Sequence, residues 1–265
     1  MQLTKHHGLG NDFLVLVDPG AAGRFDAALA VALCDRRTGV GADGLLRAVP
    51  GGPGGAEVTM VLLNADGSRA EMSGNGIRCL VQAVVDAGLA GPGEVRVATD
   101  AGLRIVTDLG RPGEPTRSLR VDMGVAKVDG DEDRWPGQGI GRGLAVDVGN
   151  PHVVLEALDE GLDVATIGAR LDAQADGGTN VELVRPGAAA DVVDMEVFER
   201  GVGVTLACGT GACAAAVAAA RWGWTGPRTT VRMPGGEVVV ELGDDGGVLL
   251  TGPATFVARV EVPGI

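Results

Sequence analysis

Ser73-Gly74-Asn75-Gly76 opens an apolar segment of the chain, and Cys208-Gly209-Thr210-Gly211 opens a second segment of the same kind. Each apolar segment ends at a glycine 15 residues after its motif begins, at Gly88 and at Gly223 (88 − 73 and 223 − 208). Apolar segments of this length that end at glycine predict a helix in each place. The chain therefore contains an internal repeat with an offset of 135 residues (208 − 73), which predicts two related domains.

The repeat extends upstream of both motifs. Asn64 lies nine residues before Ser73, at the end of a predicted strand, and Glu199 lies nine residues before Cys208 in the same setting. Two similar turns precede strands still further upstream: Gly10-Asn11-Asp12 and Gly149-Asn150-Pro151-His152. Polar side chains at strand ends and turns are able to converge on a cleft.

The remaining sequence predicts a mixed α and β protein. Short apolar runs bounded by Gly, Pro and Asp are typical of strands, and they occupy residues 13–17, 58–63, 95–98, 119–123, 144–148, 153–155, 181–184, 237–242 and 256–262. Longer apolar segments predict helices over residues 25–34, 76–87 and 211–222. Together with the repeat, this pattern predicts two similar halves that face each other across a cleft.

Composition excludes several classes of partner. The net charge of −13 gives the protein a field that repels phosphate backbones and anionic membranes, so we expect neither as a partner. No apolar signal core or membrane span of about 20 residues is present, and we expect a cytoplasmic protein. Four cysteines without a Cys-x-x-Cys pair, and only three histidines, predict reduced thiols and no metal site.

The two helix starts have a chemistry of their own. A Gly-rich turn that opens a helix points several backbone N–H groups at the same place, with the positive end of the helix dipole behind them, so anions bind there. A cysteine in this turn, such as Cys208, is expected to form a thiolate near neutral pH. Two such turns would hold a substrate carboxylate and present one proton-transfer group on each face of its α-carbon, which suits inversion of a stereocentre.

Eight segments in order along the chain resemble the signatures of the diaminopimelate epimerase family. They are His7-Gly8-Leu9-Gly10-Asn11-Asp12-Phe13, Cys34-Asp35-Arg36-Arg37 with Gly41-Ala42-Asp43-Gly44, Asn64-Ala65-Asp66-Gly67-Ser68, Gly74-Asn75-Gly76-Ile77-Arg78-Cys79, Gly149-Asn150-Pro151-His152, Thr179-Asn180-Val181-Glu182, Glu199-Arg200-Gly201-Val202-Gly203 and Ala207-Cys208-Gly209-Thr210-Gly211. The resemblance implies interconversion of LL- and meso-2,6-diaminopimelate, a step toward lysine and peptidoglycan, by a homodimer without cofactor or metal.

The resemblance also implies the fold. It implies an α+β fold of two pseudo-symmetric domains, each a curved, mostly antiparallel sheet around a central helix, with the active site in the cleft between them. With the Pro- and Gly-rich segment 110–118 as the crossover, we expect one domain over 1–117, joined by the C-terminal strand 254–265, and a second over 118–253.

The roles of individual residues follow from the resemblance alone. Cys208 would be one catalytic thiol with Glu199 near it, and His152 would lie near the other catalytic position, which here is Ser73. The distal amino-acid end of the substrate would contact Asn11, Asn64, Asn150, Asn180 and Arg200, with Glu199 also facing the substrate. The α-carboxylate at the reacting centre would contact the backbones of Gly74, Asn75, Gly209 and Thr210.

Ser73 departs from the family, which usually has its first catalytic cysteine at this position. A hydroxyl is a far weaker acid than a thiol and has no comparable anion at neutral pH. Three interpretations stay open: a cysteine changed to serine, a natural variant in which Ser73 relays protons with His152 as the base, and a protein that has moved to another substrate or lost turnover.

Two further classes of function stay open on the same residues. One is a lyase, isomerase or racemase acting on another compound, with Cys208 as the only base. The other is an amino-acid-binding protein that keeps the cleft without the chemistry. Exchange of the substrate α-proton with solvent would separate these functions from the epimerase.

Several residues have simpler interpretations. We expect Cys34, Cys79 and Cys213 to be buried small hydrophobic residues. We expect His6 and His7 at the surface, and Arg36, Arg37 and Arg78 to balance a strongly acidic surface. Lysine occurs only as Lys5 and Lys127, which leaves few candidates for a pyridoxal phosphate Schiff base.

Overall fold

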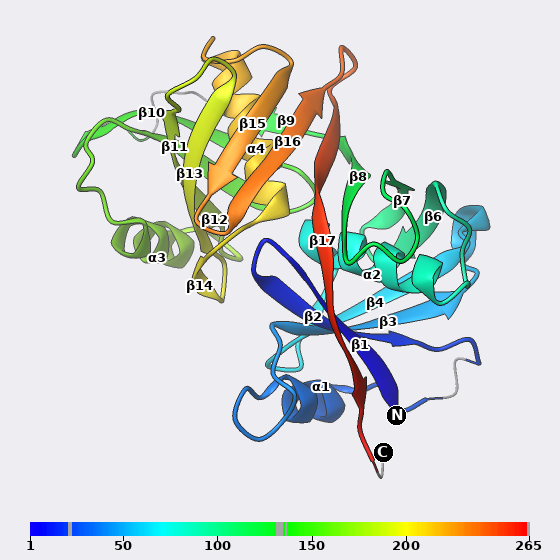
Figure 1. Cartoon of the computed structure of the whole chain (residues 1–265). Coiled ribbons are helices and arrows are strands. Elements are labelled where there is room, and N and C mark those ends of the chain that lie inside the picture. Colours follow the sequence, from blue (N-terminus) through cyan, green and yellow to red (C-terminus); the bar gives the residue numbers. More distant parts are fainter. Residues whose placement is uncertain (21–22, 131–134, 136, 264–265) are drawn as a thin grey trace. The chain divides into compact units, whose positions relative to one another are not determined.

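The computed structural model describes residues 1–20, 23–130, 135 and 137–263. The chain divides into two compact units (Figure 1). Unit 1 contains residues 1–122 and 251–265, and unit 2 contains residues 123–250. The chain passes from unit 1 to unit 2 within strand β8 (Thr116–Val125) and returns within strand β17 (Gly247–Glu261).

Unit 1 is a mixed sheet that closes around one helix. Its other elements are β1 (Gln2–Gly8), β2 (Asn11–Val17), α1 (Ala27–Cys34), β3 (Gly44–Pro50), a short 3₁₀ turn (Pro53–Gly55), β4 (Val58–Asn64), β5 (Arg69–Ala70), α2 (Gly74–Asp86), β6 (Glu94–Thr99) and β7 (Gly102–Asp108). The sheet runs β17-β1-β2-β3-β4-β6-β7-β8, and β8 pairs with β17 to close it. The pairs β2–β3 and β4–β6 are parallel.

Unit 2 repeats this order of elements. It contains β9 (Lys127–Asp129), β10 (Ile140–Asp147), β11 (Pro151–Ala157), α3 (Val164–Gln174), β12 (Asn180–Pro186), β13 (Val192–Glu199), β14 (Gly203–Thr205), α4 (Gly209–Arg221), β15 (Arg228–Met233) and β16 (Gly236–Leu242). The parallel pairs are β11–β12 and β13–β15, which correspond to those of unit 1. The predicted α+β fold of two pseudo-symmetric domains, each with a mostly antiparallel sheet, is confirmed.

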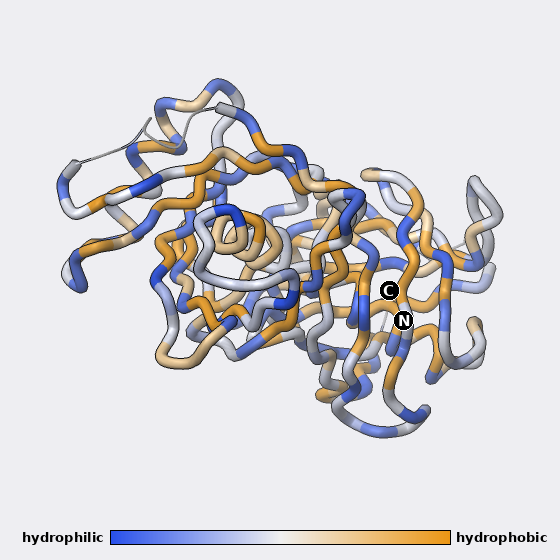
Figure 2. The backbone as a smooth tube through the Cα atoms, turned by 90° about the horizontal axis from the view of Figure 1, so that it is seen from above, coloured by the Kyte–Doolittle hydropathy of each residue, from blue (hydrophilic) through white to orange (hydrophobic). Residues whose placement is uncertain are grey.

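The two central helices are α2 and α4. Along α2 every residue except the last, Asp86, is buried, and α4 is buried almost throughout. Strands such as β8 alternate buried side chains with more exposed ones, whereas β2 and β12 are buried over several consecutive residues. Figure 2 shows hydrophobic and hydrophilic residues interspersed along the chain. The apolar side of each sheet therefore packs on one apolar helix, which accounts for the core without many aromatic residues.

Both central helices begin and end as the sequence predicts. Ser73 and Cys208 are the N-caps, and each side chain accepts a hydrogen bond from a backbone N–H three residues on. Gly88 and Gly223 follow the C-caps with φ of 70° and 76°, in the left-handed region that terminates helices. The strand ends at Asn64 and Glu199 are also confirmed.

The sequence misses helix α3 altogether. Its apolar residues Val164, Ile167 and Leu171 recur at helical spacing and pack on a core cluster of unit 2, but the segment as a whole is less apolar than the three helices that the sequence predicts. Strands β1, β3, β7 and β15 and the short strands β5, β9 and β14 are missed as well. Among the residues that the structure describes, no helix is long and apolar enough to cross a lipid bilayer.

Candidate active site

In unit 1 the candidate site begins at the first turn of α2. The hydroxyl of Ser73 accepts a hydrogen bond of 3.0 Å from the Gly76 N–H, and Ser73 itself is half-buried. Gly74 and Asn75 follow as the first helical residues and are both buried. A helix start of this kind offers backbone N–H groups to an anion.

The side chain of Asn75 connects this turn to the neighbouring strands. Its Nδ2 donates to Asn11 Oδ1 over 3.2 Å, and Asn11 Nδ2 donates to Asp43 Oδ2 over 2.9 Å. On the other side, the buried guanidinium of Arg78 donates to Asn75 Oδ1 over 2.7 Å. Arg78 was expected at the surface, and this prediction is wrong: its Nη1 bonds the Gly74 carbonyl and its Nε bonds the Pro253 carbonyl.

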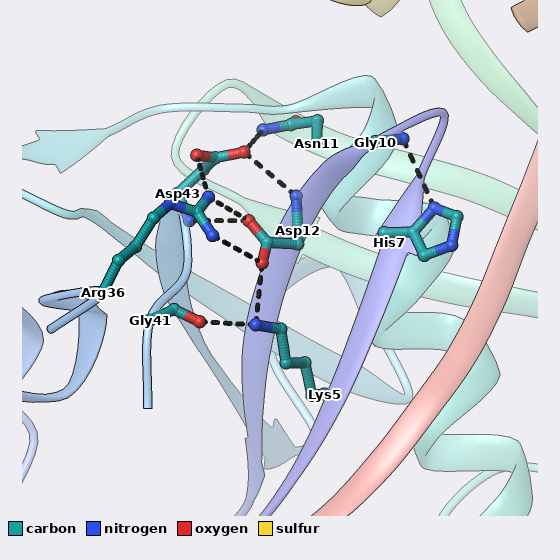
Figure 3. Close-up of polar contacts among 8 residues, drawn as sticks. All are labelled: Lys5, His7, Gly10, Asn11, Asp12, Arg36, Gly41 and Asp43. Atoms are coloured by element: carbon teal, nitrogen blue, oxygen red, sulfur yellow. Dashed lines mark hydrogen bonds and ion pairs between the residues drawn. The ribbon is translucent and has the colours of Figure 1, made fainter. Parts of the chain in front are cut away.

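A charged cluster supports Asn11 from below (Figure 3). Arg36 bonds both Asp12 and Asp43, and Lys5 bonds Asp12 and the Gly41 carbonyl. The carboxyl pKa of Asp12 is lowered, because its ion pairs with Arg36 and Lys5 outweigh the opposing effect of burial. Arg36 also bonds Oδ1 of Asp43, whose Oδ2 accepts from the Asn11 amide.

Asn64 lies at the same edge of unit 1. It pairs with Gly44 at the end of β4, and the backbone N–H that follows it bonds the Asp43 carbonyl. The Asn64 side chain donates to the Ser68 hydroxyl over 3.0 Å. Ser73, Asn75, Asn11 and Asn64 are thus all positioned by unit 1.

In unit 2 the corresponding turn opens α4. The Cys208 sulfur accepts a hydrogen bond of 3.4 Å from the Gly211 N–H and lies 3.5 Å from the hydroxyl of Thr210. Gly209 and Thr210 occupy the places that Gly74 and Asn75 have in unit 1. The two helix starts therefore share their backbone geometry and differ in their side chains.

The protonation of Cys208 differs from the prediction. Burial raises the pKa of the Cys208 thiol well above its ordinary value, and the carboxylates of Glu199 and Glu182 raise the pKa further. The hydrogen bonds from the turn lower it by less. Burial and the two carboxylates therefore oppose the thiolate that the helix start was expected to favour.

Glu199 lies beside this thiol at the end of β13. Its Oε1 accepts a hydrogen bond of 2.5 Å from the Thr205 hydroxyl, and its carboxyl group also hydrogen-bonds Cys208. Desolvation raises the pKa of the Glu199 carboxyl, partly offset by these hydrogen bonds. The Glu199 carboxyl group is therefore placed where it can exchange a proton with the Cys208 thiol.

His152 and two asparagines form the adjoining wall of unit 2. His152 is buried, with Nδ1 2.6 Å from Glu182 Oε1 and Nε2 3.0 Å from Asn150 Oδ1. Asn180 donates to the Pro151 carbonyl and accepts from the Arg200 N–H. The Arg200 side chain is exposed and bonds the Gly177 carbonyl.

Glu182 is a candidate from the sequence only as part of the Thr179-Asn180-Val181-Glu182 signature. The one available signal was a carboxylate in the middle of an apolar strand, between Val181 and Leu183. His6 was expected at the surface, and this prediction is wrong: His6 is buried and bonds Gln82 and Thr4. The expected burial of Cys34, Cys79 and Cys213 is confirmed. Within the described ranges, no group of His, Cys, Asp and Glu side chains could hold a metal ion.

Comparison with known proteins agrees with this arrangement. The chain is 40% identical to the diaminopimelate epimerase of Desulfitobacterium hafniense, covering 98% of this chain and 97% of that protein. It is 41% identical to the diaminopimelate epimerase of Mycolicibacterium paratuberculosis, covering 99% and 97%. The fold matches that of a hydroxyproline epimerase from Agrobacterium vitis with a TM-score of 0.75 at 18% identity, over 99% of this chain and 90% of that one.

The family model described as diaminopimelate epimerase matches residues 3–128 and 144–257, which contain both helix starts and every candidate site residue. The chain therefore belongs to the diaminopimelate epimerase family.

Proposed function

We propose that this protein is an isomerase that epimerises LL-2,6-diaminopimelate to meso-2,6-diaminopimelate in lysine and peptidoglycan precursor synthesis. The observation that carries this proposal is the match, at about 40% identity over nearly the whole of both chains, with proteins named diaminopimelate epimerase. The paired helix starts fit the same chemistry, because inversion at carbon needs a proton-transfer group on each face.

The proposed mechanism uses Cys208 and Ser73 on opposite faces of the substrate α-carbon. Because burial and the nearby carboxylates favour the thiol form of Cys208, we assign it the role of the acid that delivers a proton to the carbanion. Glu199 takes up the thiol proton when the reaction runs in the other direction. At the second face Ser73 occupies the place of the base, with His152 as the proposed partner of this position, and this half of the reaction is the weaker one.

The proposed substrate contacts divide by substrate group. The backbones of Gly74, Asn75, Gly209 and Thr210 would bind the α-carboxylate, since helix starts favour anions. The distal amino-acid head would contact the side chains of Asn11, Asn64, Asn150, Asn180 and Arg200, with Glu199 nearby. A second polar head requires this second set of polar partners.

The remaining proposals concern the whole protein. We propose that the two epimerase domains are residues 1–117 with 254–265 and residues 118–253, that they enclose the substrate, and that the protein works in the cytoplasm as a homodimer. We also propose that it uses no cofactor. Of its two lysines, Lys5 is engaged with Asp12 and the Gly41 carbonyl, and Lys127 is exposed on β9, so neither offers a free amine in a buried site for pyridoxal phosphate.

A second candidate is favoured by one residue. Ser73 supplies a hydroxyl where the mechanism needs a base. With this weak base, the protein would bind the amino acid but turn it over slowly or not at all. A racemase, isomerase or lyase on another substrate remains the alternative if diaminopimelate is not bound.

Incubation with LL-diaminopimelate in deuterated water tests the proposal. We expect meso-diaminopimelate carrying deuterium at the inverted carbon, because the incoming proton comes from an acid that exchanges with solvent. The measurement is NMR of the substrate together with chiral chromatography, with Cys208→Ala as the control. Label without inversion would indicate a one-base enzyme, and binding with neither label nor inversion would indicate the impaired form.

A further inference from the structure

Glu182 lies in the middle of β12 and is fully buried. Its Oε1 contacts Nδ1 of His152 over 2.6 Å. A Cβ atom placed on Gly211 would lie 2.6 Å from this oxygen and 3.3 Å from the Cys208 sulfur. The carboxyl group and the thiol therefore flank the same residue in the first turn of α4.

The contacts of His152 require a proton between the ring and Glu182. In the orientation of the Asn150 amide, Nε2 faces Oδ1 over 3.0 Å, so Nε2 carries a hydrogen and donates it. Nδ1 and Glu182 Oε1 would then repel each other unless a second proton lies between them. The other titratable groups that act on this cluster are Cys208 and Glu199.

The fold does not require this pair. In unit 2, His152 on β11 pairs with Asn180 on β12, and in unit 1 Phe13 on β2 pairs with Gly44 on β3. Two residues after Asn180 lies Glu182, and two residues after Gly44 lies Leu46. Unit 1 thus has Phe13 and Leu46, both buried, at the places of His152 and Glu182. Burial of a carboxyl and an imidazole costs more than burial of two apolar side chains, which indicates a role in the site rather than in the fold.

We propose that Glu182 is a positioning residue of the site in unit 2: its buried carboxyl group, which flanks the first turn of α4 together with the Cys208 thiol, holds the ring of His152 and the proton shared with that ring. This inference rests on the proposed function for the reaction that it serves. The contact itself is independent of that reaction and can be measured without it.

Glu182→Gln tests the inference, because it keeps the shape of the side chain and removes the acidic group. The chain has only three histidines, so ¹⁵N labelling of histidine and comparison with a His152→Gln variant identify the His152 ring nitrogens. In the unaltered protein we expect both ring nitrogens to carry or share a proton near neutral pH. In Glu182→Gln we expect this signature to be lost, and kcat to fall about tenfold or more with a smaller change in KM.

Glu196→Gln is the matched control, because Glu196 is exposed on the neighbouring strand β13 and should leave both readouts unchanged. Unchanged His152 signals in Glu182→Gln would overturn the inference. If Glu182→Gln does not fold, the unaltered protein still tests the inference. The inference is overturned if Nδ1 of His152 there neither carries nor shares a proton. If diaminopimelate is not epimerised while the His152 signals do change, the proposed function fails and the role of Glu182 stands.

Discussion

At the scale of single residues, the two helix starts are alike in geometry and unequal in chemistry. The side chains of Ser73 and Cys208 each accept a hydrogen bond from the backbone N–H three residues on, at Gly76 and Gly211. Cys208 has a carboxylate next to it, in Glu199, that can exchange its proton, whereas the hydroxyl of Ser73 has too little acidity to form an anion. Position 73 is therefore the weak half of the proposed proton transfer.

Ser73→Cys should raise turnover by about a hundredfold or more, the usual contribution of a well-placed acid or base. The check is the rate of epimerisation of LL-diaminopimelate by purified protein. Ser118→Cys, on an exposed position of β8, is the control and should change nothing. No gain in Ser73→Cys would indicate a natural serine mechanism.

At the scale of elements, the central helices depend on small residues where they begin. A Cβ on Gly211 would meet Glu182 and Cys208, and a Cβ on Gly76 would lie 3.1 Å from the Cβ of Ser73 and 3.4 Å from Phe13. The glycines thus let the side chain of Ser73 or Cys208 fold back over its own helix start. Arg78 also fixes the first turn of α2. Its guanidinium bonds the Gly74 carbonyl and the Asn75 side chain, and it bonds the distant carbonyl of Pro253 as well.

Gly211→Ala should destabilise the protein by about 1–3 kcal/mol, because the added methyl group overpacks a buried turn. It should also lower turnover, since the atoms that have to move are the Glu182 carboxyl and the Cys208 sulfur. Urea unfolding and the epimerisation assay measure the two effects. Gly161→Ala is the matched control, because a Cβ there meets nothing within 4 Å; a similar loss in both variants would contradict this account.

Arg78→Met should destabilise the protein by about 3 kcal/mol, because it leaves buried acceptors on Gly74, Asn75 and Pro253 without their donor. The free energy of unfolding in urea measures the loss. Arg69→Met provides the comparison, since Arg69 is mostly exposed and its ion pair with Asp100 is expected to contribute under about 1 kcal/mol. Equal losses would show that the buried contacts of Arg78 are not special.

At the scale of the whole molecule, buried thiols link stability to pH. Desolvation raises the pKa of Cys34 to about 11 and that of Cys79 to about 12, from 9.0 in the absence of burial. Above pH 9.0 the unfolded chain loses these protons while the folded protein keeps them. The unfolded state then binds fewer protons, so the free energy of unfolding falls as pH rises.

We therefore expect stability to decline from pH 9.0 toward about 12, with each thiol contributing at most about 1.4 kcal/mol per pH unit. Urea unfolding across this range measures the decline. Cys79→Ala removes one of the thiols and should make the decline less steep than in the unaltered protein. An identical slope in the two proteins would show that Cys79 does not carry this dependence.

The sequence by itself determined the features that depend on neighbours along the chain. The caps Ser73 and Cys208, the glycines that end both helices and the strand ends at Asn64 and Glu199 all use hydrogen bonds within a few residues. The internal repeat therefore predicted two related domains, and the ordered motifs predicted the family and, through it, the α+β fold. The roles of the site residues stay predictions.

Only the tertiary structure decided which polar groups are buried together. His6 bonds Gln82 from 76 residues away, and Arg78 bonds Pro253 from 175 residues away, so no local pattern places them inside. The same holds for Glu182, which reaches His152 across a parallel strand pair. The pKa of the Cys208 thiol depends on these tertiary neighbours in the same way. Burial and the nearby carboxylates raise this pKa, whereas the helix start, which is visible in the sequence, lowers it.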